Sequence, residues 1–180
     1  MARIKILHTA DNHLDPKLRM FGVREYDRRR DFQRTFKEVV EFALQNKPHI
    51  MLIAGDLFDS VNPRNPARTF VARALRALNN AGIKIYAIAG NHDAPKSREE
   101  GMSPLHVLEA SGLIRFFSNV SKLQTEHLQI NGLDVCISGA SFDHSLDIDA
   151  DPIAHYQMKI PIEGDINIAM FHYNISTFSV

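Results

Sequence analysis

The chain has 180 residues, of which 44% are hydrophobic and 23% are charged, the proportions of a globular protein with one hydrophobic core. Its formal net charge of zero excludes a strong overall field that would attract nucleic acid or a membrane, so any such contact needs a local patch. The single cysteine, Cys136, excludes an intrachain disulfide framework and favours a reducing compartment, and no apolar run is long enough to span a bilayer.

Strands and helices alternate along the first half of the chain. Apolar, β-prone runs predict three strands: 4–8, 49–54 and 83–89. Segments between and after these runs predict three helices: 31–46, 66–80 and 104–111. Asp31 and Asn65 are expected to cap the first two helices. This alternation indicates parallel strands that are joined by crossover helices.

The second half of the chain is predicted to form short strands with little helix. Asn131-Gly132 is a strong hairpin signal, and it separates two apolar runs: 128–130 and 133–138. An acidic loop is expected at 143–151 and a last strand at 165–171. We therefore expect a single domain over 1–180 with an α/β fold, in which two packed sheets have helices outside them in an α/β/β/α four-layer order.

Side chains that can bind a metal follow four of the predicted strands: Asp11 and His13, Asp56, Asn91 and His92, and His172. Open α/β sheets place their sites at such carboxyl ends of strands. Asp11 and His13 are two residues apart, so an extended backbone would turn both to the same side. Gly55 leaves the Asp56 carboxylate room to bridge two ions. These donors select manganese, iron, zinc or magnesium, and paired ions that share a carboxylate suit phosphoester hydrolysis.

Each of these residues also has a structural interpretation. Asn91-His92-Asp93 after Gly90 is good turn chemistry, and a loop aspartate such as Asp11 or Asp56 often caps nearby amides. A histidine that follows an apolar strand, as His172 does, is often an interior residue. The recurrence of the pattern at separate strand ends favours a metal site over these alternatives.

Three motifs in this order resemble those of the calcineurin-like metallophosphoesterases: Asp11-x-His13, Gly55-Asp56-x-x-Asp59 and Gly90-Asn91-His92-Asp93. Three further stretches look most like the DNA double-strand-break-repair nucleases of the SbcD and meiotic recombination eleven type: 8–14, the arginine-rich segment before Asp31, and 53–59. The likeness covers most of residues 4–115. It implies hydrolysis of DNA phosphodiester bonds with two divalent cations, most favourably manganese.

The resemblance also implies a role for each matching residue. The ligands would be Asp11 and His13 on the first ion, Asn91 and His172 on the second, and Asp56 between them. His92 would bind no metal but would contact the scissile phosphate and protonate the leaving oxygen. Asp93 would orient His92, and Asp59 would support the ligands from behind.

Arginines gather between Arg19 and Arg34, and Arg28, Arg29 and Arg30 are consecutive. This cluster fits a solvated loop that is balanced by neighbouring acidic residues, and it equally fits a surface that follows a phosphate backbone. The resemblance favours the second interpretation, with these three arginines in contact with DNA.

The chain departs from the family at one point. Members complete their site with a later Gly-His-x-His motif, whereas here no glycine precedes any of the nine histidines. We therefore expect the chain to match the amino-terminal part of the catalytic domain, without the DNA-capping and ATPase-binding regions. Each ion would then lack one ligand, so that one ion or none is bound and activity is poor.

These inferences predict a DNA exonuclease or endonuclease of double-strand-break repair, in the cytoplasm or nucleoid. The partners implied are DNA, a coiled-coil SMC-like repair ATPase and a second copy of the chain, with no membrane partner. One alternative is a calcineurin-like phosphoesterase that acts on small phosphodiesters or phosphomonoesters. Another is a metal-poor scaffold that binds without catalysis because its last ligands are missing.

Overall fold

The structure, a computed structural model, describes residues 2–17, 25–147 and 150–174. Four parallel strands form the first sheet, in the order β1 (Ile6–Thr9), β2 (Ile50–Ala54), β3 (Lys84–Ile88) and β4 (Arg115–Phe116). Three strands form the second sheet: β5 (Gln124–Ile130), β6 (Leu133–Gly139) and β7 (Ile166–Met170). β6 is antiparallel to β5 and parallel to β7. The prediction of a two-sheet α/β fold is confirmed.

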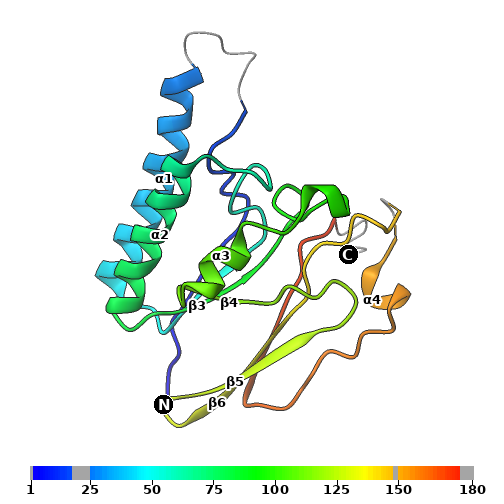
Figure 1. Cartoon of the computed structure of the whole chain (residues 1–180). Coiled ribbons are helices and arrows are strands. Elements are labelled where there is room, and N and C mark those ends of the chain that lie inside the picture. Colours follow the sequence, from blue (N-terminus) through cyan, green and yellow to red (C-terminus); the bar gives the residue numbers. More distant parts are fainter. Residues whose placement is uncertain (1, 18–24, 148–149, 175–180) are drawn as a thin grey trace, which may run out of the picture.

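Crossover helices connect the parallel strands of the first sheet. They are α1 (Glu25–Asn46), α2 (Asn65–Asn80) and α3 (Leu105–Ala110). α1 and α2 lie side by side in Figure 1, and both contribute buried side chains to one hydrophobic cluster with the sheet. Phe36, Val40 and Ala43 are the buried residues of α1, and their spacing places them on one face of that helix.

β2 is buried on both sides because it lies between the helices and the second sheet. Met51 and Ile53 belong to the cluster that includes the helices, whereas Ile50 and Leu52 belong to a second cluster. That second cluster also contains Val135 and other residues of β6 and β7, so it fills the space between the sheets. Burial on both faces explains why β2 reads as a continuous apolar run.

The predicted hairpin between β5 and β6 is confirmed. Asn131 and Gly132 both have positive φ, at 53° and 80°, which two-residue hairpin turns of this type require. The Asn131 side chain donates to the Arg3 carbonyl oxygen over 2.8 Å and lies 3.2 Å from Nε2 of His49. The tip of the second sheet is thus attached to the chain at the start of β1 and β2.

The face of the second sheet that is turned away from the first, here called the far face, carries no long helix among the described residues. Instead, the coil at Glu163 and Gly164 crosses over β6, where Gly164 packs against the backbone of Asp134 and Cys136. A helix of four residues, α4 (Pro152–His155), lies earlier in this connection.

Several boundaries differ from the sequence prediction. α1 begins at Glu25 and not near Asp31, because Asp31 pairs with arginines on the same helix rather than capping it. Arg64, and not Asn65, is the cap residue of α2, and its side chain makes no cap hydrogen bond. The short strand β4 was not predicted, since two residues carry no detectable pattern. None of the described helices has the length and apolar character needed to cross a membrane.

Candidate metal centre

The loops that follow β1 and β2 are bound to each other beyond the ends of their strands. The Asp11 amide donates to the Gly55 carbonyl oxygen at 3.2 Å, and the His13 amide donates to the Asp56 carbonyl oxygen at 3.0 Å. The Leu14 amide continues the series. These bonds bring the first motif alongside the second.

The backbone at this point is not extended, which corrects the expected geometry of the first motif. Asp11, His13 and Asp56 have φ values of 53°, 43° and 50°, in the left-handed region that non-glycine residues rarely adopt. Each such residue costs on the order of 1–3 kcal/mol, and such costs concentrate at functional sites. Asp11 and His13 still converge, since Nε2 of His13 lies 3.7 Å from Oδ1 of Asp11.

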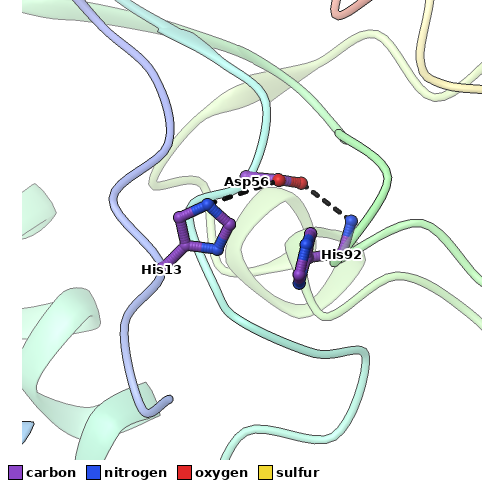
Figure 2. Close-up of side chains that lie close together, drawn as sticks. All are labelled: His13, Asp56 and His92. Carbon is purple, nitrogen blue, oxygen red and sulfur yellow. Dashed lines mark hydrogen bonds and ion pairs between the residues drawn. The ribbon is translucent and has the colours of Figure 1, made fainter.

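Asp56 lies at the centre of the cluster and is 1% exposed. Its Oδ2 atom is 3.7 Å from Nε2 of His13, and its Oδ1 atom accepts from the His92 amide at 2.8 Å (Figure 2). The same Oδ2 atom is 3.5 Å from Nε2 of His172. Burial acts to raise the pKa of Asp56, but hydrogen bonds from His172 and the His92 amide outweigh it and lower the pKa. Asp56 is therefore an ionised carboxylate that several elements share.

His172 enters the cluster from the second sheet, directly after β7. Its Nδ1 donates to the Ala54 carbonyl oxygen at 2.8 Å, which turns Nε2 toward the other polar groups. Nε2 lies 3.1 Å from Oδ1 of Asn91 and 3.9 Å from Oδ1 of Asp11. The hydrogen bond with Asp56 raises the pKa of His172 to about 9. A backbone acceptor at Nδ1 is the usual way in which proteins orient a metal-binding imidazole.

Asp59 contacts both of the other imidazole rings. Its Oδ1 atom is 3.3 Å from Nδ1 of His13 and 3.7 Å from Nδ1 of His92, and its carbonyl oxygen is 3.3 Å from the latter. The two rings meet edge to face, with centroids 4.6 Å apart. Asp59 therefore contacts the rings of both His13 and His92, and its supporting role stays a prediction.

The Asp93 carboxylate binds backbone amides and not the His92 ring, so the orienting role that the resemblance implied would be indirect. This carboxylate accepts from the Gly90 amide at 2.8 Å and from the Phe58 amide at 3.2 Å, and the residue is fully buried. Burial raises the pKa of Asp93 to about 7. Asp93 joins the loops that follow β2 and β3, while Asp59 makes the polar contacts with the His92 ring.

Two glycines are needed because the polar groups approach the backbone so closely. A Cβ at Gly55, where φ is +95°, would lie 2.4 Å from Nδ1 of His172. A Cβ at Gly90 would lie 2.2 Å from Oδ1 of Asp56. Gly90 does not adopt a left-handed φ, so its function is to leave room for Asp56 and not to form a sharp turn.

Two groups of possible metal ligands share the Asp56 carboxylate. They are Asp11–Asp56–His172 and His13–Asp56–His92, and within each the ligand atoms lie within 4.8 Å of one another. Asn91 joins the first group through its contact with His172. Carboxylate, imidazole and amide oxygens fit a divalent cation of the manganese, iron, zinc or magnesium type. The structure brings all five expected ligands together, and the role of each as a ligand stays a prediction.

An open cleft of about 690 Å³ adjoins the cluster, and part of its wall was not predicted. Asp143, His144 and Tyr173 line it together with Asp11 and His172. A neighbouring hollow beside His92 contains two lysines, Lys17 and Lys96. No motif surrounds these residues in the sequence. Only the position of Tyr173, directly after His172, gave a signal.

Arg28, Arg29 and Arg30 lie on α1 and not in a loop, and none of them lines the cleft. Arg28 pairs with Asp31 at 3.1 Å, and Nε of Arg29 donates to the Pro16 carbonyl oxygen at 2.9 Å. Arg30 lines a separate groove beside α1. The expected cluster begins at Arg19, which lies outside the described residues. These three arginines are therefore not placed to contact a phosphate in the cleft.

Comparisons with known proteins agree with this arrangement. The sequence pattern of the calcineurin-like phosphoesterases matches residues 4–179. The DNA double-strand break repair protein Mre11 of Sulfolobus acidocaldarius is 27% identical over 179 residues, which are 97% of this chain and 42% of that protein. The Mre11 of Aeropyrum pernix is 45% identical over 109 residues, 59% of this chain and 25% of the relative.

A third relative, the Mre11 of Methanopyrus kandleri, is 28% identical over 173 residues, which are 94% of this chain and 37% of that protein. The chain thus spans less than half the length of each of these relatives. Because the family match extends over almost the whole chain and its strand-end motifs meet around one carboxylate, the chain belongs to the calcineurin-like phosphoesterase family.

Proposed function

We propose that this chain is a metal-dependent phosphodiesterase that cleaves DNA, as an exonuclease or endonuclease of double-strand-break repair. The observation that carries the proposal is the position of Asp56, whose carboxylate belongs to both groups of possible metal ligands. The relatives named as double-strand break repair proteins support DNA as the substrate.

Asp11, His13, Asp56, Asn91 and His172 are the residues that we propose as ligands of two divalent cations, with manganese preferred. When bound, the two cations supply an activated water and neutralise charge on the phosphate. The chain's own contribution is to fix the donors in place. Asp56 is held by the His92 amide, and His172 is held by the Ala54 carbonyl oxygen.

His92 is the residue that we propose as general acid for the leaving oxygen. Its side chain is 42% exposed, beside the hollow that contains Lys17 and Lys96. Asp59 contacts its Nδ1 from behind, which leaves Nε2 to face the substrate. The lysines are placed to bind phosphates of the DNA backbone on the same side. Asp93 acts indirectly in this scheme, by fixing the loop that carries His92.

Contact of Arg28, Arg29 and Arg30 with DNA remains part of the proposal, at a point along the duplex away from the cleft. The protein partners that we propose are a coiled-coil SMC-like repair ATPase and a second copy of the chain. A reducing, intracellular compartment is the setting that the single cysteine favours.

The direct test compares three substrates with Mn²⁺ present: linear duplex DNA, bis(p-nitrophenyl) phosphate and p-nitrophenyl phosphate. Cleavage of DNA without hydrolysis of the monoester is expected. Hydrolysis of the small substrates alone would support a different phosphoesterase. Isothermal titration calorimetry that detects no Mn²⁺ uptake would favour the scaffold without catalysis.

A variant at His92 separates its proposed role from metal binding. His92→Gln is expected to lower DNA cleavage by roughly 10²–10⁴-fold, the usual contribution of a general acid, while Mn²⁺ uptake is retained. His155→Gln is the matched control, because His155 is exposed and outside the cleft. Loss of Mn²⁺ uptake in His92→Gln would instead make His92 a ligand, as its distance to His13 and Asp56 permits.

A further inference from the structure

A second group of metal-binding side chains lies on the far face of the three-stranded sheet. His127 on β5, Cys136 on β6 and Glu163 in the coil before β7 offer an imidazole nitrogen, a sulfur and a carboxylate oxygen within 4.8 Å of one another. His127 and Cys136 are directly paired across the antiparallel strands. None of the three lines the cleft beside Asp56, so this group is separate from the candidate metal centre.

The Asn167 side chain holds the backbone at Glu163, the third member of this group, in place. The Asn167 side chain accepts from the Glu163 amide at 2.8 Å and from the Gly164 amide at 2.9 Å, and it donates to the Gly164 carbonyl oxygen at 2.7 Å. A Cβ at Gly164 would lie 2.8 Å from the Asp134 carbonyl oxygen and 3.1 Å from the Cys136 amide. Only glycine therefore lets the coil come so close to β6, which brings Glu163 over Cys136.

Cys136 is only 1% exposed, yet two polar side chains lie within reach of its sulfur. Cys136 is a buried residue that belongs to neither of the two hydrophobic clusters. The side chains of His127 and Glu163, 47% and 62% exposed, lie beside it. The sulfur is thus placed beneath two groups that can bind a cation with it.

The spacing of the two outer ligands suits zinc. Nε2 of His127 lies 3.3 Å from Oε2 of Glu163. Tetrahedral zinc with bonds of about 2.0–2.1 Å to nitrogen and oxygen has an edge of about 3.3–3.4 Å. A donor set that includes a thiolate disfavours magnesium and calcium, so it selects a softer ion than an oxygen-rich site does.

We propose that His127, Cys136 and Glu163 form a zinc site on the far face of the second sheet. Zinc binding forms a zinc–sulfur bond, the Cys136 thiol releases its proton to solvent, and no oxidation or reduction occurs. Three protein ligands leave a fourth position for water. The bound ion joins β5, β6 and the coil before β7, and it stabilises the folded chain because the unfolded chain does not gather these ligands.

Cobalt(II) tests the site with a signal that the other metal centre does not give. A thiolate bound to cobalt produces a charge-transfer band in the near ultraviolet, and Cys136 is the single cysteine of the chain. Titration of the reduced chain, with a phosphine as reductant, is expected to give this band at one thiolate-bound cobalt per chain. Added Zn²⁺ is expected to remove the band, because zinc binds such sites more tightly than cobalt.

Variants assign the band to the three residues. Glu163→Gln and His127→Gln alter exposed side chains and are expected to weaken cobalt binding at this site by about tenfold or more. Cys136→Ser is expected to abolish the band. The control variants Glu126→Gln, beside His127 on the opposite face of β5, and His172→Gln, in the other metal centre, are expected to keep it.

Three results would overturn the proposal. The first is the absence of the band at cobalt concentrations that saturate the chain by calorimetry. The second is a band that persists with the same affinity in Glu163→Gln and His127→Gln, and the third is a band that appears only at two chains per cobalt, since either would place the thiolate in a different site. None of these results bears on DNA cleavage, so the proposed function is tested independently.

Discussion

The two halves of the candidate metal centre share Asp56 but are built in different ways. His13, Asp56 and His92 all follow strands of the first sheet, so packing within that sheet positions this half, in which we propose His13 and Asp56 as ligands and His92 as general acid. The other half combines Asp11 and Asp56 with His172, which follows β7 of the second sheet. One half thus depends on a single sheet, and the other depends on how two sheets pack together.

This difference indicates which contacts position each half of the centre. The first half is stabilised by local backbone hydrogen bonds between neighbouring loops, such as the one between His13 and Asp56. The second half relies on the bond between His172 and the Ala54 carbonyl oxygen, which joins residues that are 118 apart in the sequence. We therefore expect changes at the sheet interface to affect one half and changes at Asp56 to affect both.

Replacement of the shared carboxylate should have the largest effect. Asp56→Asn is expected to remove Mn²⁺ uptake by both halves and to lower DNA cleavage by at least roughly a thousandfold, as when a group of a catalytic unit is lost. Calorimetry and a DNA cleavage assay measure both effects. Asp147→Asn, an exposed residue of the same cleft, is the matched control. Normal Mn²⁺ uptake by Asp56→Asn would remove the basis for a shared ligand.

Loss of the ligand from the second sheet should affect only one half. His172→Gln is expected to weaken Mn²⁺ binding in that half by roughly 10–100-fold and to leave the half with His13 unchanged. The measurement is a calorimetric titration that resolves the two affinities, with His155→Gln as control. If His172→Gln abolished all Mn²⁺ uptake, the two halves would not bind Mn²⁺ independently of each other.

A matched pair of glycine variants measures the packing of the two sheets. Gly55→Ala combines a strained φ of +95° with a collision against the His172 ring, whereas Gly82→Ala has a φ of +82° and no atom within 4 Å. We expect Gly82→Ala to cost about 1–2 kcal/mol of unfolding free energy and Gly55→Ala roughly 1–3 kcal/mol more. Urea unfolding gives both values. Equal costs would show that the His172 ring moves aside without loss.

The smallest expected effect is on the stability of the fold at low pH, and it concerns Asp143, which lines the cleft together with His172. Burial acts to raise the pKa of Asp143, but hydrogen bonds from Tyr156 and the Ser145 amide outweigh it, so the pKa is lowered. An unfolded aspartate has a pKa of about 3.9, so the folded chain binds fewer protons just below that pH. Asp143 therefore contributes stability that is present above about pH 4 and is lost as the pH falls through its folded pKa.

Asp143→Asn should abolish this contribution. Urea unfolding of the variant between about pH 3 and pH 6 is expected to show a flatter decline of stability on the acid side than that of the wild type. Asp147→Asn, a change at another aspartate that lines the same cleft, is the matched control. An unchanged slope in Asp143→Asn would contradict the lowered pKa.

The sequence was sufficient to predict the parallel sheet and the polar groups at its strand ends. Apolar runs such as 50–54 and the motif at Asp11 are local signals, and parallel strands bring their carboxyl ends together by topology. The hairpin at Asn131-Gly132 was likewise predictable, because positive φ restricts the residue types.

Features that depend on tertiary contacts could not be predicted in this way. Asp93 follows His92 in the sequence, yet its carboxylate points to the amides of other residues, and Asp59 makes the polar contacts with the His92 ring instead. The start of α1 was misplaced because Asp31 is as good a capping residue as it is an ion-pair partner. The group of His127, Cys136 and Glu163 was not predicted, because the coil that carries Glu163 is distant from Cys136 in the sequence.

The hairpin tip at Asn131 has a mechanical consequence for the opposite end of the molecule. Asn131 attaches the second sheet to Arg3 and His49, beside the first residue of β2, while His172 attaches it to Ala54, the last residue of β2. Because the two sheets are attached at both ends of one short strand, these contacts oppose sliding of one sheet past the other. The alignment of His172 with its neighbours is therefore decided in part by an amide side chain at the other end of the sandwich.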